Sequence, residues 1–290
     1  MLKERTYIDP TVKIVDSRFD PENLSQFLLF LLVGPIRMHL CVVDSETNRC
    51  LTFESYSTEA NTSTLRFLEN VEHIIDTHPY LSARFWKSIH FCVANDKFTL
   101  IPESLFRPEN CANYLKLNCE LDSETEDMKY HTHKQAGIVN VFAIPKHFEQ
   151  LSKQFYPGKK VQFLHHTSPI IESGLRLQGP VLLVCVGYEY MTVLAKDQQV
   201  LKFCNKFFFK TDEDFIYYLF LVVEELGLSA FVQVALFGEI NAKSSKYLEM
   251  KKYFPNVAFG SRPSTLQFGY VFDEIPDQSY LDLFAVSYCL

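Results

Sequence analysis

The chain has 290 residues, enough for one large domain or two of ordinary size, and 47% of them are hydrophobic, which excludes a disordered chain. Its formal net charge of −7 argues against binding to nucleic acid, because such binding needs clustered Lys and Arg to neutralise phosphates. The 8 cysteines form no Cys-x-x-Cys pair, so neither a zinc ribbon nor a redox dithiol is indicated.

Three features of the sequence predict a cytoplasmic protein. Several cysteines lie inside apolar strand runs, where a free thiol packs as a small hydrophobe and suits a reducing compartment. The polar start of the chain lacks the apolar core of a signal peptide. The longest apolar run, Phe27 to Val33, is far too short to cross a bilayer, so we expect no transmembrane segment.

The first half of the chain is predicted to consist of strands separated by helices. The continuous apolar run at Phe27 to Val33 is typical of a strand buried on both faces. Apolar residues at steps of three and four predict a helix from about 62 to 77, capped by Asn61 or Thr62. The other expected elements are strands at 37–43, 49–56, 89–94, 98–101, 128–133, 138–144 and 161–165, and helices ending near 117, from Pro145 in its first turn to 155, and at 168–177.

The second half begins at Gly179-Pro180 and repeats this scheme. Its expected elements are strands at 181–187, 190–196 and 199–208, a helix capped by Thr211 or Asp212 and ending near Gly227, a strand at 231–237, a helix to about 253, strands near 257–260 and 266–272, and a terminal apolar segment at 280–290. Strand groups that alternate with helices indicate an α/β fold in which helices cover a mixed sheet.

Two stretches, 27–53 and 180–208, read as copies of one unit. The matching residues are Gly34, Met38, Leu40 and Asp44 in the first copy and Gly187, Met191, Val193 and Asp197 in the second. A duplicated three-strand meander feeding a helix predicts two similar half-domains that face a cleft. The expected parts are a polar N-terminal segment at 1–22, a first half-domain at 23–178 with a strand-strand-Pro-helix element at 126–156, and a second half-domain at 179–290.

This repeated layout resembles the actin-like ATPase superfamily, which includes Hsp70, hexokinase and the division protein FtsA. Within it the chain is more similar to the PilM group, cytoplasmic scaffold proteins of type IV pili, and to the related cytoplasmic domain of type II secretion. Four segments carry this likeness: Met128 to Tyr130, Val139 to Pro145 with its helix, Val161 to Leu177, and Leu182 to Gly187. The chain also resembles a bacterial domain-of-unknown-function family with a degenerate form of this layout. The resemblance implies a duplicated actin-like (ribonuclease H-like) fold.

In that superfamily each half supplies a loop similar to Asp-x-Gly at the end of its first strand. The aspartates organise the metal and the attacking water, and the glycine lets backbone amides approach the phosphates. The matching triplets here end in Gly34 and Gly187, but Leu32 and Cys185 replace the aspartates and cannot bind magnesium. The resemblance therefore implies no catalytic residue, metal or cofactor in this chain.

The superfamily's adenosine-binding turn resembles a strand that ends in Gly-Gly before a helix. Here the corresponding pair is Gly238-Glu239, and the Glu239 side chain would crowd a nucleobase or ribose. The resemblance thus implies a remnant cleft formed by Gly34, Gly187, Gly238 and Glu239. The alternative for Gly238 is a plain turn that needs glycine for its backbone geometry, and we favour it.

Three other patterns admit a functional and a structural interpretation. His131 and His133 alternate on a strand and, with His165-His166, would suit a metal site, but paired histidines on half-exposed strands explain them as well. The acidic stretch Asp122 to Asp127 lacks the EF-hand spacing and is expected to be a solvated loop. In Phe207-Phe208-Phe209, either one ring faces outward as a contact surface or the strand is buried on both sides.

We therefore predict a non-catalytic actin-like-fold protein that acts as a protein-interaction or assembly scaffold. Its protein partners are not identified by the sequence, and a homodimer is compatible with it. The alternative is a binder of ATP or another phosphorylated ligand in the interdomain cleft, either a sensor or an atypical ATPase- or kinase-like enzyme. A third alternative is an unrelated α/β binding protein whose repeat is accidental.

Overall fold

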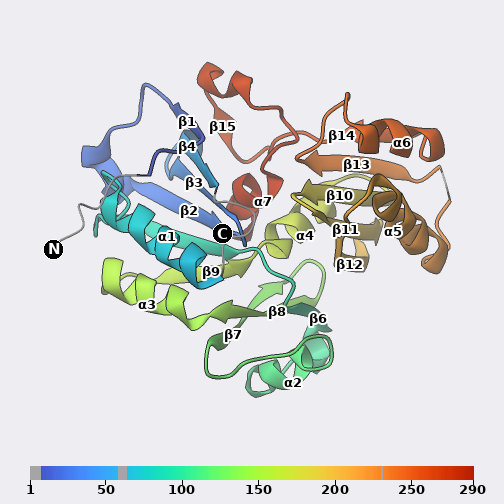
Figure 1. The fold of residues 1–290 in the computed structure, drawn as a ribbon, viewed down its shortest axis with the longest axis horizontal. Helices are drawn as coiled ribbons and strands as arrows, with labels where there is room; N and C mark the ends of the chain where they lie inside the picture. The colour runs from blue at the N-terminus through green and yellow to red at the C-terminus, as the bar shows by residue number, and fades with distance from the viewer. Residues whose placement is uncertain (1–7, 58–63, 230) are drawn as a thin grey trace. The chain divides into compact units, whose positions relative to one another are not determined.

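The computed structural model describes residues 8–57, 64–229 and 231–290, which group into two compact units (Figure 1). The first unit holds the described residues up to Thr132 together with Gly137–His166 and Thr265–Asp273. The second unit holds His133–Ala136, Thr167–Ser264 and Glu274–Leu290. The half-domain bounds expected from the sequence repeat remain predictions.

The first unit is built on a mixed sheet. Its strands lie side by side in the order β1 (Val12–Val15), β4 (Arg49–Ser57), β3 (Arg37–Asp44), β2 (Phe27–Val33), β5 (Ser88–Val93) and β9 (Val161–His165), and β15 (Gln267–Phe268) pairs with β4. The meander β2-β3-β4 is antiparallel, whereas β2, β5 and β9 run parallel. Every residue of β2 is buried, as its continuous apolar sequence predicted.

Helices α1 (Thr64–Thr77) and α3 (Lys146–Phe155) cover one face of this sheet (Figure 1). Val71 and Leu151 pack into one core with Leu29 of β2, because apolar residues recur at helical spacing on both helices. The predicted caps of α1 at 61 and 62 lie outside the described residues. Pro145 was expected in the first turn of α3 but stands just before it with ψ 131°, because it also ends the preceding strand.

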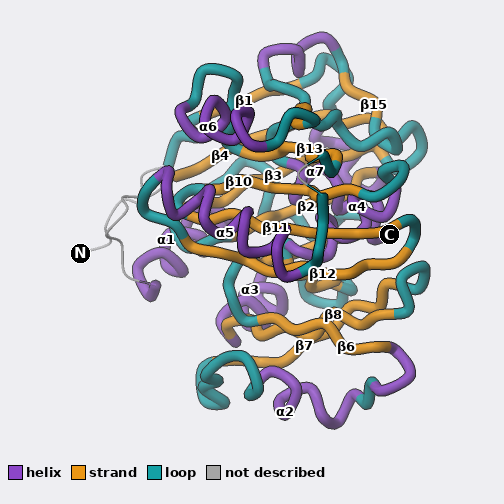
Figure 2. Tube along the Cα trace, turned by 90° about the vertical axis from the view of Figure 1, so that its right-hand side faces the viewer, coloured by secondary structure: helices purple, strands orange, loops and turns teal. Residues whose placement is uncertain are grey.

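A smaller antiparallel sheet also belongs to the first unit, and Figure 2 shows it beside α2 (Cys111–Leu115). Its strands follow the order β6 (Phe98–Pro102), β8 (Ile138–Pro145) and β7 (Glu126–His133), and only the last residue of β7 belongs to the second unit. Val141 of β8 packs towards α2, whereas its neighbour Phe142 joins the core of the main sheet. Because successive side chains of β8 point to opposite faces, this strand contributes to both hydrophobic cores. The short helices nearby in the chain are η1 (Pro21–Gln26), η2 (Glu103–Leu105) and η3 (Pro108–Asn110).

A buried carboxylate joins three parts of the first unit. Glu54 of β4 is fully buried and lies 2.9 Å from His78 Nε2 and 3.0 Å from Lys13 Nζ. The hydroxyl of Tyr56 donates to the same carboxylate over 2.5 Å. Burial by itself raises the pKa of Glu54, but the hydrogen bonds from His78 and Tyr56 outweigh it and hold that pKa at about 2. Glu54 is therefore ionised and paired inside the unit.

The second unit is built on a sheet with the order β12 (Val200–Phe208), β11 (Tyr190–Asp197), β10 (Val181–Gly187), β13 (Gln233–Gly238) and β14 (Val257–Phe259). Helices α5 (Asp212–Glu225) and α6 (Ser245–Tyr253) pack together, and their buried side chains join the core on one face. Helix α4 (Thr167–Arg176) contacts β10, β11 and β12, and the terminal helices α7 (Leu281–Phe284) and η5 (Ala285–Cys289) pack against it. The short helix η4 (Tyr270–Glu274), which belongs to the first unit except for Glu274, precedes them in the chain. Of the two caps predicted for α5, Thr211 is the one observed, and it forms a capping box with Asp214.

The two meanders share an irregularity that strengthens the case for duplication. The register between the second and third strands shifts directly after Val42 in the first unit and directly after Ala195 in the second. Each shift falls eight residues beyond the matched glycine, Gly34 or Gly187. In both units the first strand of the meander also pairs in parallel with a later strand, β5 or β13. The predicted repeat is therefore visible in topology and in strand irregularity.

Candidate functional site

The first loop implied by the resemblance directly follows β2. The Gly34 N–H donates to the carbonyl oxygen of Arg37 over 2.8 Å, which closes a tight turn. Leu32, which stands where the superfamily has an aspartate, is buried in the sheet. A Cβ on Gly34 would make only ordinary contacts, 3.6 Å from Ala94 Cβ. This loop therefore offers neither a metal ligand at Leu32 nor an uncommitted amide at Gly34.

The second loop ends β10 at Gly187 and lies beneath an aromatic ring. Gly187 pairs with Tyr190 across the strands, and a Cβ on the glycine would fall 2.6 Å from Cε1 of that ring. The Nζ of Lys206 stands 4.0 Å from the centroid of the same ring. A stacked ring and cation thus occupy the space beside the glycine that the resemblance assigns to a phosphate loop.

The turn at Gly238 and Glu239 also uses its backbone donors inside the protein. Gly238 N–H donates to the carbonyl oxygen of Gln278 over 2.8 Å, and Glu239 N–H donates to that of Val186 over 2.7 Å. Gly238 has φ +90°, and a Cβ there would come within 2.8 Å of the Val186 carbonyl carbon and overlap its oxygen. Glycine is therefore required by backbone geometry, which is the structural interpretation favoured above.

Two carboxyl groups near Cys185 form an acidic cluster that the sequence did not predict. Burial, and after it the charge of Glu239, raises the pKa of Asp282 to about 6, although backbone hydrogen bonds and then the charge of Lys206 act in the opposite direction. Burial, Asp282 and Glu239 also raise the pKa of the Cys185 thiol. Asp282 lies in α7 near the end of the chain, far from any recognised motif, so only the fold brings it to this loop. Two carboxyl groups against the one cation of Lys206 leave this end of β10 with a negative balance, which disfavours a bound phosphate.

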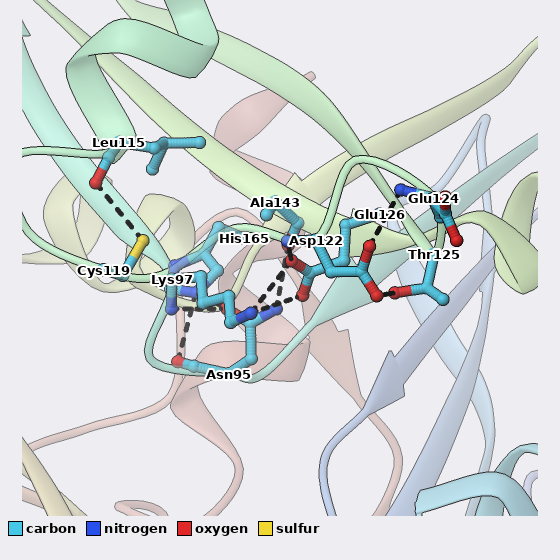
Figure 3. A network of polar contacts seen from close by, with 10 residues as sticks. All are labelled: Asn95, Lys97, Leu115, Cys119, Asp122, Glu124, Thr125, Glu126, Ala143 and His165. Carbon is cyan, nitrogen blue, oxygen red and sulfur yellow. Dashed lines mark hydrogen bonds and ion pairs between the residues drawn. The ribbon is translucent and has the colours of Figure 1, made fainter.

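The candidate metal-site histidines have separate partners. In the second unit, His133 Nδ1 lies 2.8 Å from Glu172 Oε1, and Arg176 donates to the other oxygen of that carboxylate over 2.6 Å. In the first unit, His165 Nε2 lies 3.2 Å from the side-chain oxygen of Asn95 (Figure 3). The His165 ring also stacks on Phe98. Within the described ranges, no three His, Cys, Asp or Glu side chains are grouped so that they could hold a metal ion.

The acidic stretch at 122–127 closes on itself and on the neighbouring sheet (Figure 3). Asp122 accepts the Glu124 N–H over 2.9 Å and the Thr125 hydroxyl over 2.8 Å. Glu126 accepts the Asp122 N–H over 3.0 Å and pairs with Lys97 at 2.8 Å. These carboxylates therefore stabilise the loop, which is solvent-exposed over most of its length, as expected.

An apolar groove of about 290 Å³ runs between β12 and α5 in the second unit. We call it the β12 groove; its lining residues are Phe203, Asn205, Phe207, Leu221, Val222, Glu225 and Leu226. On the opposite face of β12 from the groove, Phe208 is 55% exposed, whereas Phe209, directly after the strand, is buried. Of the two interpretations of the Phe207-Phe208-Phe209 run, an outward-facing ring is therefore correct.

Solved structures identify the fold of the chain. A protein from Bacteroides thetaiotaomicron with an actin-like ATPase fold and unknown function superposes with a TM-score of 0.79 at 20% identity, covering 94% of this chain and all of that one. The PilM-PilN type IV pilus biogenesis complex gives a TM-score of 0.57 at 11% identity, covering 91% of this chain and 98% of that one. The fold is therefore that of the actin-like ATPases, as the sequence predicted.

The family is fixed by a sequence comparison. A family model described as a protein of unknown function (DUF3822) matches residues 16–257, so the chain belongs to that family. A search of the curated proteins gives no match. Over the described part of the chain, no helix combines the length and apolar character needed to cross a membrane.

Proposed function

We propose that this chain is a non-catalytic actin-like-fold protein that acts as a protein-interaction module, and that the β12 groove is its docking surface. The observation that carries the proposal is an apolar groove alongside an exposed strand edge. Its non-catalytic character is supported by Leu32 and Cys185 at the positions of the missing aspartates and by the internally bonded amides of Gly238 and Glu239.

The strand edge favours an extended partner. Within the described residues, β12 is the outermost strand of its sheet, so one side of its backbone is available for pairing. An added strand would pair with these backbone groups and place every second side chain towards the groove, as in β-augmentation. Phe203 and Phe207 supply the apolar wall that such side chains would contact.

The charges at the groove indicate which residues the partner carries. Glu225 lines the groove, and Glu224 precedes it in the last turn of α5, which has no basic residue. Carboxylates at a helix C-terminus are unfavourable because that end of the helix dipole is already negative. A Lys or Arg from a partner would neutralise them. We therefore commit to an extended segment with alternating apolar side chains and one basic residue. PilM, which has the same fold, is solved in complex with PilN, and this supports a protein partner.

A peptide-display selection against the folded full-length chain tests this assignment. Enriched peptides should alternate apolar residues and carry a Lys or Arg, and their binding should protect β12 amides from hydrogen exchange. Leu221→Asp should abolish that binding, whereas Leu117→Asp, at a leucine 81% exposed in the first unit, should leave it unchanged. Glu225 is exposed, so Glu225→Lys should leave the fold intact and shift the selected peptides from basic to acidic. The proposal is overturned if no peptides are enriched, or if the same peptides are enriched with the wild-type chain, Leu221→Asp and Glu225→Lys.

A further inference from the structure

A second cavity lies in the first unit, where α3 ends and β9 begins. Its volume is about 540 Å³, within the range of small-molecule pockets. Its lining residues include Glu149, Lys153, Tyr156, Lys159, Lys160 and Phe163, and we call it the basic cavity. No motif in the sequence pointed to it, because Lys159-Lys160 is too short a basic run to stand out.

The charge of the basic cavity is positive although the chain as a whole carries −7. Glu149, the acidic residue in its lining, pairs with Lys129 and lies 3.3 Å from Lys153. Its hydrogen bond from Lys129 lowers the pKa of Glu149, so the carboxylate is ionised and already compensated. Lys159 and Lys160 make no ion pair with any described residue, which leaves two cations at the cavity for an external anion.

A buried phenol provides an independent observation. Tyr156 is only 2% exposed, and among the described residues its hydroxyl has no hydrogen-bond partner. Burial also raises the pKa of Tyr156, so the hydroxyl keeps its proton and can donate. Leaving a buried donor unpaired costs roughly 1–3 kcal/mol. Tyr156 is one of the cavity's lining residues, and an acceptor oxygen that reached its hydroxyl from the cavity would remove that cost.

The basic cavity is distinct from the remnant phosphate loop of the same unit. Strands β2, β5 and β9 are parallel, and Val161 at the start of β9 pairs with Ile89, which pairs with Leu29. The cavity includes Val161 and therefore lies towards the amino ends of these strands. Gly34 follows the carboxyl end of β2, the end at which α/β sheets usually bind ligands. The two places are at opposite ends of the sheet.

We propose that the basic cavity binds a small phosphorylated anion. Lys159 and Lys160 contact the phosphoryl oxygens, and Tyr156 donates its hydroxyl hydrogen to one of them. Two unpaired lysines match a group that carries close to two negative charges better than they match a single carboxylate. Phe163, with Lys129 Nζ at 5.8 Å from its ring centroid, gives an apolar wall for the organic part of the ligand. This inference is independent of the β12 groove.

Calorimetric titration of the full-length chain with inorganic pyrophosphate at about 0.1 M salt tests the site. At that salt concentration, long-range attraction between charges is screened, so binding must come from close contacts. Wild type should bind, and Lys159→Gln with Lys160→Gln should weaken binding by about tenfold or more. Lys116→Gln with Lys134→Gln, at two exposed lysines elsewhere in the chain, is the control with the same charge loss and should leave affinity unchanged.

Tyr156→Phe separates a built site from general attraction to surface lysines. It leaves the charge unchanged and removes one hydroxyl, so pyrophosphate binding should weaken several-fold while thermal stability stays equal or rises. The proposal is overturned if pyrophosphate fails to bind, or if all variants bind equally. Retention on vesicles containing phosphatidic acid, without pyrophosphate binding, would also overturn it, because the source of the phosphate would then be a lipid headgroup.

Discussion

The ring of Tyr190 lies directly against the backbone of Gly187, with Cε1 only 2.6 Å from where a Cβ on the glycine would be. Lys206 stacks on that ring. In the actin-like superfamily this glycine is expected to leave room for phosphates, yet here the room is taken by a side chain from the adjacent strand. A Cβ at position 187 would therefore displace this ring, so the glycine here contributes to side-chain packing.

The first prediction separates these two reasons for glycine. Gly187→Ala should destabilise the fold by about 1–3 kcal/mol, because the new methyl must displace a packed ring. Gly34→Ala is the matched control, since its Cβ would meet only contacts of 3.6 Å and longer. Chemical denaturation of both variants measures the difference. An equal loss of unfolding free energy in the two variants would show that the Tyr190 ring moves aside without destabilising the fold.

The second prediction concerns nucleotides. With the basic cavity disabled by Lys159→Gln and Lys160→Gln, the chain should show no thermal stabilisation by ATP or ADP with magnesium, because Leu32 and Cys185 offer no oxygen ligand for magnesium and Tyr190 covers Gly187. A ligand present at a hundred times its dissociation constant would add about 2.7 kcal/mol, which thermal denaturation detects easily. A shift that Gly187→Trp abolishes would reinstate the phosphate-binding alternative.

The duplicated meander could be predicted from the sequence because its signals are local. A continuous apolar run, a glycine and a polar turn at the same spacing fix three neighbouring strands in each copy. The outermost strand β1 was missed because Val12–Val15 is short and mostly exposed, so it carries little hydrophobic pattern. The matching register shifts after Val42 and Ala195 leave no composition signal, since a bulge is a property of strand pairing.

The candidate sites were harder to predict than the fold. Gly238 was identified correctly as a backbone requirement, because a glycine between a strand and a turn is typical of a position with positive φ. Asp282 was not predicted, because its partners Glu239 and Lys206 are distant in sequence and are brought to it by the packing of α7. The basic cavity likewise combines a helix end, a loop and a strand, none of which carries a recognisable motif.

The third prediction follows from the acidic cluster around Asp282. Its pKa of about 6 in the folded chain is above the ordinary value of 3.8, so folding favours the protonated acid. As pH rises from about 4 to about 6, the unfolded chain loses this proton first, and stability falls. Asp282→Asn should therefore stabilise the protein by about 2–3 kcal/mol at pH 7.5 and have little effect on stability near pH 3.5.

A double-mutant cycle with Glu239→Gln tests the cause of that shift. Glu239 contributes through its charge, so the stabilising effect of Asp282→Asn at pH 7.5 should be smaller in the Glu239→Gln background. Thermal unfolding at pH 3.5 and 7.5 gives both values. An unchanged effect would assign the raised pKa of Asp282 to burial alone.

The fourth prediction concerns Glu54, the buried carboxylate of the first unit. Its contribution to stability falls on acidification, opposite to the pH dependence expected from Asp282. The pKa of Glu54 is lowered to about 2 from 4.5, so the paired carboxylate stabilises the fold above pH 4.5 and loses that effect as pH falls towards 2. Glu54→Gln should cost about 3–5 kcal/mol at pH 7, because it leaves His78 and Lys13 facing a neutral amide. Glu249→Gln, at a surface pair with Lys252, should cost at most about 1 kcal/mol. The stability curves of wild type and Glu54→Gln should converge on acidification, and parallel curves from pH 7 down to pH 3 would mean that Glu54 is not the ionised group.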